Sequence, residues 1–237
     1  MIITKYQGRL GNRILHAVGS SILSKKFDLY VDDYNNLSND INILYPNFNF
    51  SYGKNFKLVK IYDVNSSDGG ILLSDLIKME KINFGLDLES TSFQQKDFVL
   101  NYRKEIIDHF NLKYDLPNND LFIHVRLGDV IHTNPGLDFY RRSINSINYN
   151  NGYISSDSPD HPIVKSLISE FNLTLYNNSP IETINFAKNF NNLILSKGTF
   201  SWWIGVLSKA ENIIYPIGDT PWYGDIFVYE DWKPIQI

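Results

Sequence analysis

Two short segments of this 237-residue chain hold residues that could bind phosphate groups. The first, His124–Asp129, overlaps the end of an apolar, strand-like run. The second, Ser196–Ser201, joins another apolar run to a helix-like segment. The first N–H groups of a helix are unpaired and the helix dipole is positive there, so this place favours a phosphate. Together the segments predict a site for a diphosphate, with a nucleotide sugar as its favoured carrier.

Arg126 is the first candidate for a phosphate ligand. A guanidinium can hold two phosphate oxygens in a bidentate grip and keeps its proton. The alternative is an ordinary ion pair, with Asp129 as the suggested partner. His124 is expected to point into the core with its ring hydrogen-bonded, and a role as catalytic base is the less favoured interpretation.

Thr199 and Ser201 could donate their hydroxyls to phosphate oxygens while the amides of the same turn do so too. The alternative is simple N-capping of the following helix, and the two roles are compatible. Trp202 and Trp203 are expected to be packing residues, at least one of them buried.

Two more segments are weaker candidates. Ser155-Ser156-Asp157 could bind ribose hydroxyls or a base edge through the carboxylate, or could be an ordinary turn. Gly8–Asn12 resembles a phosphate-cradling loop, but it lacks the third glycine of a dinucleotide fingerprint and the ending of a P-loop. The alternative is an ordinary tight turn, in which glycine is needed only for its backbone freedom and Asn12 is the N-cap of the following helix.

Alternating strand and helix patterns in the second half position these residues. This alternation implies parallel strands with right-handed crossovers, and in such sheets ligands bind beyond the carboxyl ends of the strands. The polar segments at 126–129, 155–157 and 196–201 all lie at such ends. The predicted strands are Leu121–Val125, Gly152–Ser155, Leu173–Tyr176, Leu193–Leu195 and Ile213–Tyr215, and the predicted helices are Leu137–Ile147, Ile163–Phe171, Ile181–Phe190 and Phe200–Ala210.

The first half is less regular, and residues 32–56 are assigned to no element. The polar, proline-containing segment Leu116–Asn119 predicts a boundary between an acceptor-side lobe of residues 1–117 and a nucleotide-sugar-binding lobe of residues 118–237. The elements expected in the first lobe are a strand at Ile2–Tyr6, a helix over Ile14–Ile22, a strand at Leu29–Val31 and a helix over Phe98–Phe110.

Composition narrows the classes of function. The net charge of -4 gives no electrostatic footprint for nucleic acid. The absence of cysteine excludes disulfides, zinc–thiolate sites and cysteine nucleophiles. No signal peptide or membrane-spanning run is visible, so we expect a soluble, cytoplasmic protein without stable membrane insertion.

These motifs, taken in order, resemble those of glycosyltransferase family 11, the α-1,2-fucosyltransferases. The family's motifs Gly-Arg-Leu-Gly-Asn-Gln and His-x-Arg-Arg-Gly-Asp-Tyr have their counterparts in Gly8–Arg13 and His124–Val130. Its closing motif Ser-Asn-Ser-Ser-Phe-Ser-Trp-Trp-Gly is similar to Ser196–Ile204. Further similarity lies at Phe139–Arg142, Ile154–Asp157, Pro216, Trp222 and Trp232.

The resemblance implies an α/β fold of the GT-B type, with two Rossmann-like lobes facing across a cleft and a reduced N-terminal lobe. It implies inverting transfer of L-fucose from GDP-β-L-fucose to a sugar hydroxyl, in α-1,2 linkage to galactose or a similar sugar. No cofactor and no essential metal are expected, and the partners are the nucleotide-sugar donor and a glycan acceptor. Arg126 and Asp129 are then the catalytic residues, and the donor-binding residues are Gly8, Gly11, Asn12, His124, Arg126, Asp157, Thr199, Phe200 and Ser201.

The departures from the family pattern include Leu127 in place of the second arginine, Arg13 in place of glutamine and Ile204 in place of glycine. The catalytic base stays open among Asp129, Asp138 and His16, and acceptor contacts are expected from the first lobe and from Trp222-Tyr223. The alternatives are a transferase that uses another nucleotide sugar, and a catalytically silent glycan-binding protein on the same fold.

Overall fold

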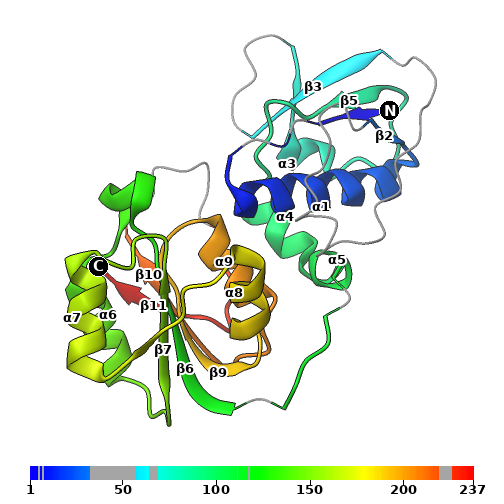
Figure 1. The fold of residues 1–237 in the computed structure, drawn as a ribbon. Helices are drawn as coiled ribbons and strands as arrows, with labels where there is room; N and C mark the ends of the chain where they lie inside the picture. Colours follow the sequence, from blue (N-terminus) through cyan, green and yellow to red (C-terminus); the bar gives the residue numbers. More distant parts are fainter. Residues whose placement is uncertain are drawn as a thin grey trace. The chain divides into compact units, whose positions relative to one another are not determined.

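The computed structural model of the protein describes residues 1–4, 6, 8–32, 57–63, 69–110, 112–116, 118–218 and 226–237. Backbone contacts divide the chain into two compact units, one of Met1–Asn111 with Trp222–Ile226 and one of Leu112–Pro221 with Phe227–Ile237. The main division thus lies between residues 111 and 112, where the sequence predicts 117 and 118. Each unit is a mixed α/β structure built on a parallel sheet (Figure 1).

The second unit holds a six-stranded sheet in the order β11-β10-β9-β6-β7-β8. All of its neighbouring strands run parallel, as the alternation of elements predicts. The sequence analysis did not find β11, a largely exposed edge strand that shows no apolar run. The strands are β6 (Asn118–Val125), β7 (Gly152–Ser156), β8 (Thr174–Leu175), β9 (Phe190–Ile194), β10 (Asn212–Ile217) and β11 (Lys233–Gln236).

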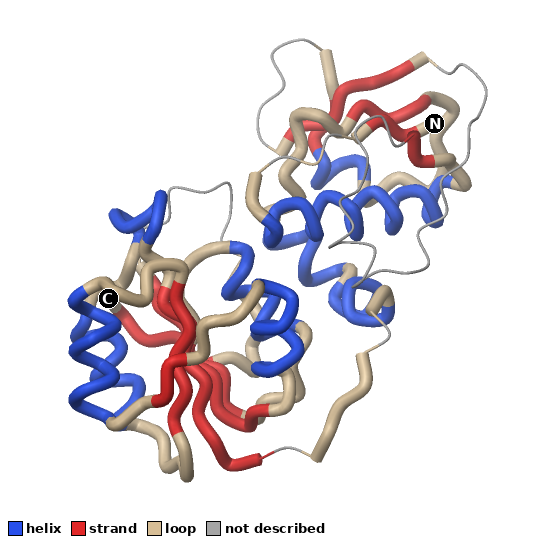
Figure 2. The backbone as a smooth tube through the Cα atoms, viewed as in Figure 1, coloured by secondary structure: helices blue, strands red, loops and turns tan. Residues whose placement is uncertain are grey.

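Helices cover both faces of this sheet, α6 and α7 on one side and α8 and α9 on the other (Figure 2). Successive side chains of β6 point to opposite faces of the sheet, so this strand contributes to the core on each side. Ile123 packs with residues of α6 and α7, whereas the ring of Phe122 lies 6.0 Å, centroid to centroid, from that of Phe186 in α8. The helical elements are η1 (Gly128–Thr133), α6 (Leu137–Asn145), α7 (Pro162–Phe171), α8 (Pro180–Ala187) and α9 (Thr199–Val206).

Local sequence explains where these helices begin. Pro162 opens α7 behind His161, whose ring accepts a hydrogen bond from the Ile163 amide. Ser179 and Glu182 form a capping box at the start of α8. Two predicted helix ends were wrong: Phe190 begins β9 instead of closing α8, and α9 stops at Val206 instead of Ala210.

The first unit holds a five-stranded parallel sheet in the order β2-β1-β5-β3-β4. Its strands are β1 (Ile2–Ile3), β2 (Val31–Asp32), β3 (Leu58–Tyr62), β4 (Ile71–Leu72) and β5 (Gly85–Asp87). Its helices are α1 (Leu10–Phe27), α3 (Leu73–Leu76), α4 (Lys96–Asn101) and α5 (Arg103–Asp108).

Several predictions for this unit need correction. The strand expected at Ile2–Tyr6 is confined to Ile2–Ile3, and the single helix expected around Phe98–Phe110 is broken at Tyr102, whose φ of -116° and ψ of 19° are not helical. Asn12 is not an N-cap, because α1 already begins at Leu10 with Arg9 in the cap position. Gly8 has a φ of 77°, which fits the predicted tight turn.

A buried contact ties the end of β3 to the segment after β5. The Oδ2 atom of Asp63 accepts hydrogen bonds from the amide and the hydroxyl of Ser92, both at 2.6 Å. Burial raises the pKa of Asp63, although these hydrogen bonds act in the opposite direction. The next residue, Phe93, is fully buried, and its φ of 60° is a left-handed backbone conformation that residues other than glycine rarely adopt. This segment is therefore held by specific contacts.

No helix in the described ranges is long and apolar enough to cross a lipid bilayer.

Candidate functional site

The order of strands in the second unit reverses between β6 and β9. From β6 the chain continues through β7 to β8 on one side, and from β9 through β10 to β11 on the other. In open parallel sheets, ligands bind beyond the carboxyl ends of the strands at such a reversal. The two segments with predicted phosphate ligands follow β6 and β9, so the fold brings them to this point.

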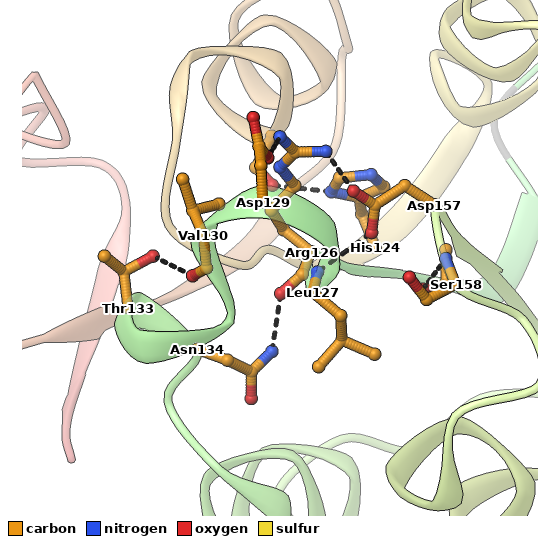
Figure 3. Close-up of polar contacts among 11 residues, drawn as sticks. His124, Arg126, Leu127, Asp129, Val130, Thr133, Asn134, Asp157 and Ser158 are labelled. Carbon is orange, nitrogen blue, oxygen red and sulfur yellow. Dashed lines mark hydrogen bonds and ion pairs between the residues drawn. The ribbon is translucent and has the colours of Figure 1, made fainter.

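Arg126, just after β6, is held between two carboxylates (Figure 3). Its guanidinium donates to Asp157 after β7 and to Asp129 in η1. The side chain of Arg126 is 15% exposed, and those of Asp157 and Asp129 are 21% and 54% exposed. The predicted ion pair with Asp129 therefore forms, and a phosphate at Arg126 would meet a guanidinium that already has acidic partners.

Asp157 also contacts the backbone just after β6. Its Oδ1 atom accepts a hydrogen bond from the Leu127 amide at 2.9 Å, while Oδ2 accepts from Arg126. Sequence reasoning assigned this carboxylate to ribose or a base edge. In the structure both of its oxygens bind the protein, so Asp157 fixes the position of Arg126.

Asn134 is a residue that sequence reasoning missed. Its side-chain amide donates to the Arg126 carbonyl at 2.7 Å, and its oxygen accepts from the Gly136 amide at 2.9 Å. It thereby holds the loop between β6 and α6. The turn signal Asn-Pro-Gly at residues 134–136 could have identified it.

His124 lies in the core, as predicted. Its Nδ1 atom is 2.6 Å from the Ser201 hydroxyl oxygen, and its ring meets the ring of Phe200 edge-on, with centroids 5.1 Å apart. Burial lowers its pKa to about 4; the charge of Asp157 opposes this shift and that of Arg126 adds to it. His124 is thus neutral near pH 7 and joins β6 to α9.

The turn into α9 begins with Gly198, whose φ is 108°. As the cap residue of α9, Gly198 has no side chain that could make a capping hydrogen bond. The N-capping alternative for Thr199 and Ser201 is therefore wrong, because Gly198 is the cap residue and the two follow it inside the helix. Ser201 is only 1% exposed and its hydroxyl contacts His124, whereas Thr199 and Phe200 are half-buried. Trp202 and Trp203 are both fully buried, which confirms their packing role.

Lys197, directly before this turn, was also missed as a candidate. It is 7% exposed and lies at the carboxyl end of β9. A methyl group added at Gly218 would be 3.7 Å from its Nζ atom, so the amino group lies near the end of β10. A lysine that closely follows an apolar, strand-like run is the sequence signal that could have identified it.

The remaining candidates belong to other elements. Gly8, Gly11 and Asn12 belong to the first unit, as does His16, which is 5% exposed in α1. Asp138 lies in the first turn of α6, where its side chain is 88% exposed and pairs with Arg141 at 3.4 Å. Trp222 and Tyr223 lie outside the described residues. Among the residues that are described, no three His, Asp or Glu side chains gather as metal ligands would.

The site thus contains an arginine paired with two carboxylates, a helix start whose cap residue is a glycine, and small polar residues at the ends of neighbouring strands. This arrangement can bind an anion and orient hydroxyl groups beside it. None of the protein-family models matches the chain. A search of curated proteins also found no match.

Proposed function

We propose that the protein is an inverting glycosyltransferase of the GT-B type, which transfers L-fucose from GDP-β-L-fucose to a sugar hydroxyl without an essential metal. The observation that carries the proposal is the meeting of the Arg126 segment and the α9 turn at the strand-order reversal. The His124–Ser201 contact of 2.6 Å joins these two segments. The parallel sheet in each unit agrees with this architecture, and the ordered motifs favour this family.

In the proposed reaction, the acceptor oxygen attacks the anomeric carbon from the face opposite the diphosphate. The bond from that carbon to the phosphate oxygen breaks, and its electron pair stays on the departing GDP. The acceptor's proton passes to a carboxylate, for which Asp129 is the candidate nearest to Arg126.

Arg126 and the first amides of α9 would stabilise the negative charge that develops on the diphosphate. Donors that are already in position cost no reorganisation during the reaction, and removing one such donor typically lowers kcat by about 100- to 1000-fold. Leu127 stands where the family pattern has a second arginine, and its side chain is buried in the core. Lys197 supplies another amino group at the end of the neighbouring strand β9.

The test combines calorimetry with a transfer assay on Arg126→Ala. Wild-type protein should bind GDP and GDP-fucose and release GDP when galactose-terminated acceptors are present. Arg126→Ala should lose most of the transfer while circular dichroism shows an intact fold. Arg141→Ala is the matched control, because it removes the same charge from an exposed pair with Glu170.

Three outcomes separate the alternatives. Undiminished transfer by a folded Arg126→Ala variant refutes the role of Arg126. Preference for another nucleotide sugar identifies a different donor on the same site. Binding of glycans with no affinity for any nucleotide indicates a glycan-binding protein without turnover.

A further inference from the structure

Three polar or aromatic residues lie level with one another across the first three strands of the second unit. His124 on β6 pairs in register with Ser155 on β7. Ile154 pairs with Leu175 on β8, so the next residue, Tyr176, lies level with Ser155. The Tyr176 amide donates to the Ile154 carbonyl at 2.8 Å, which keeps it in line with the sheet.

These three side chains share one face of the sheet. His124 contacts Phe200 and Ser201 of α9, and Tyr176 contacts Phe186 of α8, so both point to the side that carries α8 and α9. Ile154 belongs to the core on the α6 and α7 side, so alternation turns Ser155 to the opposite face. The row thus runs from the start of α9 to the edge strand β8.

Tyr176 has an aromatic ring in a fixed orientation. Its ring stacks on that of Phe186 with centroids 4.0 Å apart and an angle of 1° between the planes. Phe186 is itself held by Tyr153 and Phe190, at 5.3 Å and 4.9 Å. Tyr176 nevertheless remains partly exposed, and because Phe186 covers one face, the exposed part is the other face or the edge.

We propose that Tyr176 is the stacking platform for the nucleobase of the donor. This inference rests on the proposed function, because it assumes that the diphosphate lies at Arg126 and the start of α9. Neighbouring strands are about 4.8 Å apart, so Tyr176, directly after β8, lies roughly 10 Å across the sheet from β6. A ribose then lies between them, over Ser155 of β7 and Asp157 just after that strand, and the base reaches the Tyr176 ring.

A ring that is already held in place loses little freedom when a base stacks on it. Because every base has a flat π face, stacking of this kind supplies affinity without selecting the base. Tyr176 therefore accounts for nucleotide affinity, while the choice among bases falls to groups at the base's edge.

The test compares GDP with inorganic pyrophosphate by calorimetry on wild type and three variants. Tyr176→Leu keeps apolar bulk but removes the aromatic face, and it should weaken GDP binding by about 5- to 150-fold while pyrophosphate binding stays unchanged. Tyr176→Phe keeps the ring and should bind GDP as wild type does. Tyr153→Leu is the matched control, because it removes another contact of Phe186 farther from the edge and should leave GDP affinity unchanged.

A second measurement does not depend on how the leucine variant folds. In wild-type protein with labelled tyrosine, protons of the bound guanine should show nuclear Overhauser effects to one tyrosine ring, and Tyr176→Phe should remove that signal. Effects to a different tyrosine, or equal affinity of wild type for GDP and pyrophosphate, overturn the inference but leave the diphosphate site standing. Binding of neither ligand overturns both this inference and the proposed function.

Discussion

His124 and Ser201 are 77 residues apart in the chain, yet Nδ1 of one lies 2.6 Å from Oγ of the other. This contact joins the end of β6 to the first turn of α9, at the point where the strand order reverses. It makes a buried, neutral histidine part of the frame that positions Arg126 and the α9 amides.

The first prediction concerns the pH dependence of stability. Folded His124 has a pKa of about 4, whereas an unfolded histidine has one near 6.5. Between these values the unfolded state binds more protons, so the free energy of unfolding should fall as the pH drops from 6.5 towards 4. Because each pKa unit corresponds to about 1.4 kcal/mol, the loss attributable to His124 approaches about 3 kcal/mol.

Urea unfolding at pH 7 and pH 4.5 measures this loss. His124→Gln cannot titrate, so its stability should depend less on pH than that of wild type, while all other groups contribute equally to both proteins. Identical pH dependence in the two proteins would contradict the prediction.

The second prediction tests whether the turn into α9 binds phosphate, and separates this role from the backbone strain that a substitution at Gly198 adds. Gly198 has a φ of 108°, and apart from its two chain neighbours no atom of the described residues lies within 4 Å of the place where an added methyl would sit. Gly198→Ala should therefore cost about 1–3 kcal/mol through backbone strain alone, and the shifted turn should weaken GDP binding. Denaturant unfolding and calorimetry measure the two effects.

Gly136 provides the control for that variant. It caps α6, has a φ of 82° and has the same open surroundings. Gly136→Ala should lose similar stability but bind GDP more tightly than Gly198→Ala does. Equal affinities in the two variants would remove the support for a phosphate at α9.

The third prediction divides the binding role of Asp129 from its catalytic role. Its carboxylate is exposed and pairs with Arg126, where it competes with a diphosphate. Asp129→Asn should raise GDP affinity by up to about 5-fold, because an exposed ion pair contributes at most about 1 kcal/mol. If Asp129 is the base, kcat should fall by at least about 100-fold. Steady-state kinetics with calorimetry on one preparation checks both, and an unchanged kcat would assign the base elsewhere.

The fourth prediction concerns the core of the first unit. A methyl group at Gly19 would lie 2.5 Å from the ring of Phe93, which is fully buried and held in a left-handed conformation. Gly19→Ala should therefore cost about 1–3 kcal/mol of unfolding free energy.

Ser20, the next residue in α1, should behave in the opposite way. Its buried hydroxyl has no hydrogen-bond partner among the residues that the structure describes. Ser20→Ala should be neutral or stabilise the protein by about 1 kcal/mol, because it removes an unsatisfied polar group. Urea unfolding of both variants checks the pair, and a stable Gly19→Ala variant would show that Phe93 can move.

The second unit was more predictable than the first because its elements are signalled locally. Buried parallel strands such as β6 and β9 read as apolar runs, and α7 shows its core face through Leu167 and Ile168. Strands of two or three residues, such as β4 and β5, are too short to produce a pattern. The exposed edge strand β11 carries no apolar signal.

The candidate site was predictable as a set of residues but not as a set of contacts. Arg126 and the Ser196–Ser201 turn were recognised because strand ends and helix starts have chemical consequences that residue type reveals. The double role of Asp157, 31 residues beyond Arg126, was not, because it depends on the register of β6 against β7.

The amino-acid sequence alone determined that this is an alternating α/β protein with small polar residues and an arginine at the ends of its strands. Those features depend on residues close together in the chain, through apolar periodicity and turn chemistry. The tertiary structure decided that β6 and β9 are neighbours, that Asp157 holds Arg126 and that Tyr176 lies level with Ser155. Such relationships arise from strand order and register, which are set by burial of the whole sheet rather than by any local segment.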